Sequence, residues 1–172
     1  MHWKKNGSSL PILFFLLLFC TTVVAEQIGG FWKTINEETA KTQSIIAVYE
    51  YMGIYYGRII ASCDKNGEIN DSIYAPIGRA DGMPGKPYYS GMDILWNLRL
   101  SGSKYKGKIL DPRDGSVYSA TLWRNDNNLM VRGELLFFGK TKTWLPAWDS
   151  DFPDNFRKPD LKKFIPLIPQ LD

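Results

Sequence analysis

Hydrophobic and polar residues alternate over short stretches along most of the chain after residue 25. The clearest examples are two related phrases, Tyr55-Tyr56-Gly57-Arg58-Ile59 and Tyr105-Lys106-Gly107-Lys108-Ile109. Successive side chains of a strand point to opposite faces, so each phrase places Tyr, Gly and Ile on one face and a basic residue on the other. The pattern predicts strands with one packed face and one solvated face.

Segments of this kind recur at regular spacing and are separated by turns rich in Gly, Asn, Asp and Pro. Eight are predicted to be strands: residues 31–34, 44–51, 54–62, 92–98, 105–110, 117–123, 129–137 and 140–145. No segment before residue 146 has a helical period. The fold class is therefore all-β. Even spacing and tight turns favour an antiparallel up-and-down barrel of about eight strands, which has no free sheet edge.

Two segments lack the strand pattern. Residues 63–91 form a long connection dense in Gly, Pro, Asn and Asp, and long loops in compact domains usually carry function or wrap the surface. Residues 147–172 follow the predicted barrel domain, 26–146, and interleave prolines with aromatic residues. Proline cannot continue a ladder or a helix, so we expect an extended tail against the barrel, with at most one helical turn near residues 160–164.

Residues 1–25 are typical of a secretory signal peptide. Lys4 and Lys5 precede an apolar stretch over residues 10–20, and small residues ending in Ala25 precede Glu26. We expect cleavage after Ala25 and export to the periplasm or beyond the cell, with no membrane span in the mature protein. A retained anchor and lipidation of Cys20 are the alternatives.

Charge and rare residues exclude several kinds of function. The chain has 21 basic and 18 acidic residues, and Lys4 and Lys5 leave with the signal, so the mature protein is near neutral and nucleic acid is not an expected partner. The single histidine, His2, also leaves, which removes Ser-His-Asp and Cys-His catalysis and zinc sites that use histidine. Cys63 is then alone, so no internal disulfide is expected, and we predict a buried apolar thiol.

The acidic residues give weak signals. Asp64, Asn66 and Glu68, like the turn at residues 111–115, lack the ligand spacing of a calcium loop. The remaining acid–base candidates are explained by turns, hairpin ends or an exposed strand face: Glu50, Glu134, Asp111 and Asp114. We therefore predict no catalytic residue, no metal and no cofactor, and expect that the protein is not an enzyme.

Charged residues also occupy the face predicted to point away from the core: Arg58, Lys106, Lys108, Arg132, Glu134, Lys140 and Lys142. A barrel embedded in an outer membrane would need an apolar band there. The distribution favours a barrel in water.

Ordered motifs resemble an exported bacterial family catalogued only as a domain of unknown function. They are Gly-Arg-Ile at residues 57–59, Gly-Lys-Ile-x-Asp-Pro-x-x-Gly-x-x-Tyr at 107–118, Val-Arg-Gly at 131–133, and Gly-Lys-x-x-Thr-Trp at 139–144. The resemblance spans about residues 30–144 and implies a lipocalin-like, calycin-type barrel. Gly30-Phe31-Trp32 is similar to the Gly-x-Trp phrase that opens lipocalin barrels, with Trp32 plugging the closed end. Pro146 departs from the family, whose members usually carry Arg there.

The inward faces of five predicted strands would line an interior that mixes apolar bulk with three hydroxyl groups. The candidate ligand-binding residues are Tyr55, Ile59, Ile94, Trp96, Tyr105, Ile109, Tyr118, Leu122, Val131 and Leu135. Gly57, Gly107 and Gly133 lie mid-strand, where glycine either permits bending or leaves room for a ligand. An eight-stranded barrel has just enough room for packed side chains or for one small ligand, so the strand number leaves both open.

Three functions are compatible with this sequence. The first is an exported carrier of a small lipophilic molecule, which requires an open apolar interior. The second is a structural or partner-binding envelope protein with a filled barrel, in which the connection and the tail contact an envelope protein. The third is a histidine-free hydrolase of envelope sugars, which requires two carboxylates in a cleft. The carrier is the leading hypothesis.

Overall fold

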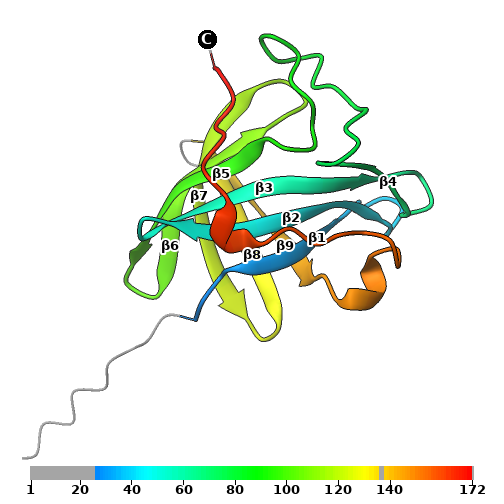
Figure 1. The fold of residues 1–172 in the computed structure, drawn as a ribbon. Coiled ribbons are helices and arrows are strands. Elements are labelled where there is room, and N and C mark those ends of the chain that lie inside the picture. The colour runs from blue at the N-terminus through cyan, green and yellow to red at the C-terminus, as the bar shows by residue number, and fades with distance from the viewer. Residues whose placement is uncertain (1–25, 136–137, 172) are drawn as a thin grey trace, which may run out of the picture.

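The structure, a computed structural model, describes residues 26–135 and 138–171, so the predicted signal peptide lies outside the described residues. Strands dominate the described chain, and two short 3-10 helices, η1 (Asp149–Asp151) and η2 (Leu161–Lys163), follow them (Figure 1). The strands are β1 (Gly30–Ile35), β2 (Thr42–Tyr51), β3 (Ile54–Cys63), β4 (Ile69–Ser72), β5 (Asp93–Ser101), β6 (Lys104–Asp111), β7 (Ser116–Asn125), β8 (Asn128–Leu135) and β9 (Phe138–Pro146).

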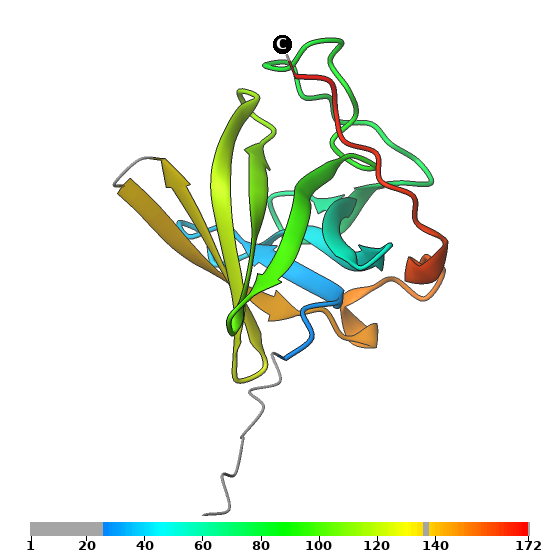
Figure 2. The ribbon, with the colours of Figure 1, turned by 90° about the vertical axis from the view of Figure 1, so that its left-hand side faces the viewer.

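Eight of these strands close into an antiparallel barrel (Figure 2). The order is β2-β1-β9-β8-β7-β6-β5-β3, β2 also pairs with β3, and β4 extends from β3 outside the barrel. The all-β, up-and-down prediction is therefore confirmed. The closing ladder between β1 and β9 is short, because it pairs only Trp32 with Pro146 and Lys33 with Leu145.

Side chains alternate between the two faces as expected along β6. Tyr105 is buried, whereas Lys106 and Lys108 are exposed. The alternation fails in β5, where the ladder with β6 shifts register between Trp96 and Arg99 and Asn97 has a φ of 54°. Trp96 consequently lies opposite Lys108 and shares its outward face.

The mid-strand glycines serve two purposes. A Cβ atom on Gly57 would lie 2.7 Å from Leu95 Cδ1, and one on Gly107 would lie 2.5 Å from the carbonyl oxygen of Trp96. These two glycines allow backbones and side chains to approach closely where the sheet curls. Gly133 differs, because its nearest neighbour, Ile109 Cγ2, would be 3.5 Å away, an ordinary contact.

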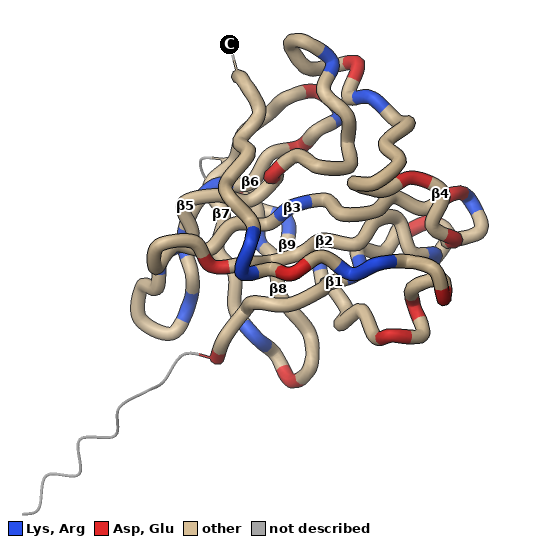
Figure 3. The backbone as a smooth tube through the Cα atoms, viewed as in Figure 1, with Lys and Arg blue, Asp and Glu red and all other residues tan. Residues whose placement is uncertain are grey.

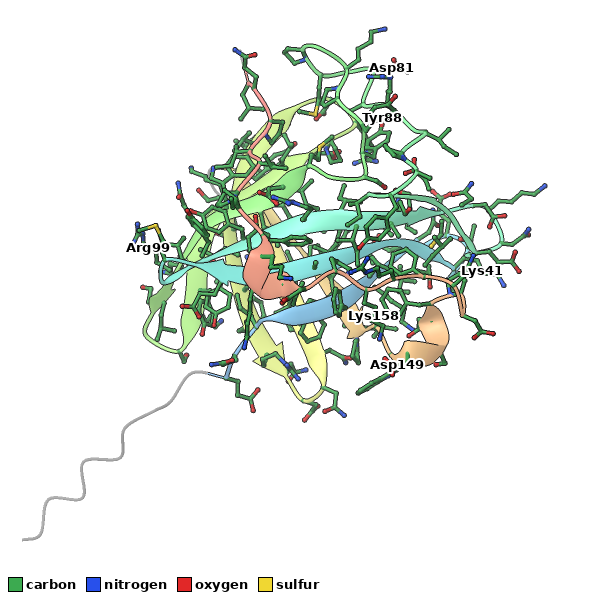
Figure 4. The ribbon with its side chains drawn as sticks, viewed as in Figure 1. Lys41, Asp81, Tyr88, Arg99, Asp149 and Lys158 are labelled. Atoms are coloured by element: carbon green, nitrogen blue, oxygen red, sulfur yellow. The ribbon has the colours of Figure 1, made fainter. Side chains whose placement is uncertain are left out.

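The proline-rich tail lies against the outer surface of the barrel. Its expected helical turn is η2, and η1 is a second turn where the sequence predicted at most one. In Figures 1 and 3 the tail crosses in front of β2 and β3, and Figure 3 shows basic and acidic residues alternating along it. Phe152 is buried in a second, smaller apolar cluster on this outer face, with residues of β2 and β3. Lys158 also pairs with Asp149 within the tail, where Figure 4 labels both residues.

Arg58 is the strongest exception to the predicted solvated face. Its side chain points outward but is only 6% exposed, because the tail covers it. Arg58 Nε donates to Asp93 Oδ1 at 2.9 Å, and its Nη2 donates to the carbonyl of Ile165 at 2.6 Å. The backbone N–H of Asp93 donates to the carbonyl of Leu167 at 3.1 Å. The expectation that Arg58 faces water is therefore wrong.

The connection over residues 63–91 contains β4 and then runs beside one end of the barrel. Its tip, where Figure 4 labels Asp81 and Tyr88, is held by a bridge between Arg79 and Tyr88. Gly82 lies directly against the backbone of Arg113, so the connection reaches the turn between β6 and β7. No helix in the described part of the chain is long and apolar enough to cross a membrane.

Candidate ligand-binding cavity

One end of the barrel is closed by packed side chains. Trp32 is 3% exposed, and its Nε1 donates to the carbonyl of Ile28 at 2.9 Å. The guanidinium of Arg124, from β7, lies 4.9 Å from the ring centre of Trp32. Trp32 is therefore part of the packed closed end, and Arg124 places a cation against it.

Above this plug the barrel is hollow. A cavity of about 1190 Å³ opens at the end of the barrel where β1, β6 and β8 end and β9 begins. Figure 4 labels Lys41 at this end and Arg99 at the opposite end. Trp144, Val131 and Ile109 are among its apolar wall residues. The volume is sufficient for one small amphiphile.

Six of the ten candidate ligand-binding residues line this cavity: Ile59, Ile94, Ile109, Tyr118, Val131 and Leu135. Gly133 lines it too, so this glycine does leave room in the interior.

The other four candidates, Tyr55, Trp96, Tyr105 and Leu122, are buried in the core and do not line the cavity. Tyr55 and Tyr105 pack edge to face with ring centres 5.2 Å apart. Burial of the hydroxyl, and to a smaller extent its hydrogen bond with Glu50, raises the pKa of Tyr55 to about 12. Trp96 does not line the cavity because it shares the outward face of Lys108, next to the irregularity of β5. Alternation alone could not show where along the barrel axis the packing stops, because residues of the same face differ in depth.

The sequence pattern predicts an outward face for two lysines of β9 that the structure places at the rim of the cavity. On β9, Lys140 lies opposite Gly133 and Lys142 lies opposite Val131. Directly opposed residues of an antiparallel pair share a face, so both lysines belong to the inward face and line the cavity. Trp144 lies two residues after Lys142 on the same face of β9 and is buried. Its spacing from the two lysines is the sequence signal that indicates an inward face for them.

Two carboxylates neutralise much of this positive charge. Glu37, in the β1–β2 turn, pairs with Lys140 at 2.5 Å and with Lys142 at 3.5 Å. Asp111, at the end of β6, pairs with Arg113 at 2.5 Å. A hydrogen bond from Lys140 lowers the pKa of Glu37, and one from Arg113 lowers the pKa of Asp111, so both carboxylates are ionised at neutral pH.

The cavity also has polar residues that the sequence pattern does not predict to line it. The hydroxyls of Thr34 and Ser44 lie 2.6 Å apart, and Tyr89 enters from the long connection. Cys63 lies at the cavity wall and is only half-buried, although burial raises the pKa of its thiol to about 11. Within residues 26–135 and 138–171, no three His, Cys, Asp or Glu side chains are grouped closely enough to hold a metal ion.

Comparison with known families shows to which family the chain belongs. Residues 30–145, more than half of the chain, match a family described as "Uncharacterized protein conserved in bacteria (DUF2147)". The chain belongs to this family. The DUF2147 match covers the barrel strands almost to the end of β9 and stops before the tail that covers Arg58. No curated protein and no solved structure is significantly similar to this DUF2147 chain.

Proposed function

We propose that the protein is an exported carrier that binds one small lipophilic molecule inside its barrel. The observation that supports this most is the cavity of about 1190 Å³, which apolar side chains such as Ile59, Ile109 and Val131 help to line, while Trp32 and the core fill the other end of the barrel. A barrel with a purely structural role would gain stability by filling this space, because buried voids weaken packing. Export rests on the signal-like residues 1–25.

The hydrolase alternative is less well supported. Glu37 and Asp111 are the acidic residues of the cavity, and each is engaged by basic side chains. A glycosidase needs one carboxyl group with a raised pKa that can donate a proton. The pKa of both groups is lowered instead, so neither is suited to act as the general acid.

Binding of an apolar fluorescent dye tests the carrier function. The wild-type protein should bind one dye molecule per chain, with a rise in fluorescence. Val131→Trp should abolish binding, because Val131 lines the cavity wall and indole is much larger than isopropyl.

Met130→Trp is the matched control, since Met130 is the neighbour of Val131 on the other face of β8 and does not line the cavity. This variant should bind dye like wild type, and circular dichroism should show both variants folded. A wild-type protein that binds neither dye nor any amphiphile would exclude the carrier function.

One observation favours a partner-binding role on a different surface. The end of the tail exposes apolar side chains: Ile165 at 63%, Leu167 at 58% and Ile168 at 44%. In Figures 1 and 2 this end runs beside the long connection, where Ile77 is 70% exposed. Exposed apolar side chains grouped on one segment often mark a contact surface, so the second candidate function is binding of an envelope protein there.

A further inference from the structure

The two inward lysines of β9 belong to a line of same-face side chains that runs from the rim of the cavity to its base. From the rim, the inward positions of β9 are Phe138, Lys140, Lys142 and Trp144, opposite Leu135, Gly133, Val131 and Leu129 of β8. Phe138 is 84% exposed and Trp144 is 4% exposed, so the row runs from solvent to the packed core. The lysines stand between an open rim and an apolar base.

The carboxylate of Glu37 bridges both of these lysines from the β1–β2 turn, which follows the strand next to β9 in the barrel. Its Oε2 lies 2.5 Å from Lys140 Nζ and its Oε1 lies 3.5 Å from Lys142 Nζ. The turn that carries Glu37 is held by its own contacts, because the side chain of Asn36 accepts hydrogen bonds from the N–H groups of Glu38 and Thr39 at 2.9 and 3.0 Å. The turn therefore holds the carboxylate of Glu37 at the entrance of the cavity.

The charge at the mouth is not balanced by its own carboxylates. Asp111 is chelated by the guanidinium of Arg113, through Nε at 2.9 Å and Nη2 at 2.5 Å. Three basic side chains of the cavity, Arg113, Lys140 and Lys142, are therefore matched by only two carboxylates, Glu37 and Asp111, which leaves one positive charge in excess beside the apolar wall residues. An ammonium group beside apolar surface is most stable with an anionic partner that accepts its hydrogen bonds.

We propose that the ligand is an amphiphile with a carboxylate head and a long apolar tail, and that its head replaces Glu37 at Lys140 and Lys142. The tail then lies along Ile59, Ile109 and Val131 toward Trp144. The side chain of Glu37 occupies the head-group position until the ligand displaces it. This inference rests on the proposed carrier function and names the chemical class of its ligand.

Three amphiphiles with the same sixteen-carbon tail test the head group: palmitic acid, hexadecanol and hexadecylamine, each below its micelle concentration. Displacement of the apolar dye from the wild-type protein at pH 8 should show the acid binding about tenfold more tightly than the alcohol, with the amine weakest. Replacing both lysines (K140Q and K142Q together) should lower the affinity for the acid to that for the alcohol and leave the alcohol unchanged.

Glu37→Gln gives the sharper test, because it removes a competitor and changes only one exposed turn residue. It should raise the affinity for palmitic acid several-fold and leave hexadecanol unchanged. The matched control is K106Q with K108Q, two exposed lysines on the outward face of β6, which should change neither affinity.

Equal affinity of the wild-type protein for acid and alcohol would overturn the carboxylate assignment while the carrier function stands. Weaker binding of the acid by Glu37→Gln would overturn the displacement of Glu37. Absence of binding by all three amphiphiles and by the dye would instead overturn the carrier function itself.

Discussion

At the scale of single residues, the least expected feature is the buried ion pair of Arg58 and Asp93. Asp93 is 0% exposed and accepts hydrogen bonds from Arg58, from the hydroxyl of Tyr49 at 2.8 Å and from the N–H of Leu167. Alternation correctly placed Arg58 on the outward face. Its burial could not be predicted, because the covering residues lie in a tail more than a hundred positions away in the sequence.

Asp93→Ala should strongly destabilise the protein. The substitution leaves the guanidinium of Arg58 buried without its carboxylate, which typically costs about 3–5 kcal/mol of unfolding free energy. Urea unfolding measures the loss.

The matched control is Asp81→Ala, which removes an exposed pair with Lys86 at 3.3 Å and should leave the midpoint almost unchanged. Similar small shifts for both variants would show that the buried pair contributes no more than a surface pair.

At the scale of strands, sequence periodicity predicted the eight barrel strands and their order of pairing but not their irregularities. Alternation holds where ladders are regular, as between β6 and β7, which pair from Tyr105 opposite Leu122 to Asp111 opposite Ser116. It fails in β5, whose residue Asn97 has a positive φ that no hydrophobic pattern signals. This irregularity explains why Trp96 was assigned to the interior. The lysines of β9 were misassigned for a different reason, because the β8–β9 ladder is regular and both lysines share a face with Trp144.

Two glycine substitutions should separate curvature from cavity space. Gly107→Ala places a Cβ atom 2.5 Å from a backbone carbonyl oxygen, which cannot move without shifting β5. We expect a loss of about 1–3 kcal/mol in unfolding free energy, as for other overpacked sites.

Gly133→Ala places its Cβ at an ordinary 3.5 Å from Ile109 Cγ2 and should leave the stability nearly unchanged. Chemical denaturation of both variants makes the comparison. Equal losses would mean that Gly133 is as tightly packed as Gly107.

At the scale of the whole molecule, the sequence indicated a barrel and a signal peptide but could not decide whether the barrel was hollow. Eight strands fit either outcome. The answer depends on how deeply the side chains pack: Tyr55, Tyr105 and Leu122 fill the closed half, whereas Gly133 and Ile109 face open space. Depth along the barrel axis results from strand tilt and stagger, which a pattern of period two does not contain.

The free energy of unfolding should depend on pH in the alkaline range, because two buried groups have raised pKa values. Burial raises the pKa of Tyr55 from 10.0 to about 12 and that of Cys63 from 9.0 to about 11. The folded protein therefore holds protons that the unfolded chain releases, so stability should be complete below pH 9 and fall between about pH 9 and 12. Urea midpoints at pH 8, 10 and 11 measure this fall.

Tyr55→Phe should reduce the loss between pH 10 and 12, because it removes one of the ionising groups. A slope that is the same in wild type and variant would show that Tyr55 does not contribute to it.

The brief ladder between β1 and β9 determines when the barrel can be completed. Its partners are the first and last barrel strands, so the chain entropy of joining them is the largest of any neighbouring pair. The residues that reinforce it come later still: Ala147 donates to the carbonyl of Phe31 at 2.9 Å, and Lys33 pairs with Asp151 at 2.7 Å. A growing polypeptide must therefore remain a curled sheet with two unpaired edges, and open to unwanted strand addition, until its final barrel strand has been made.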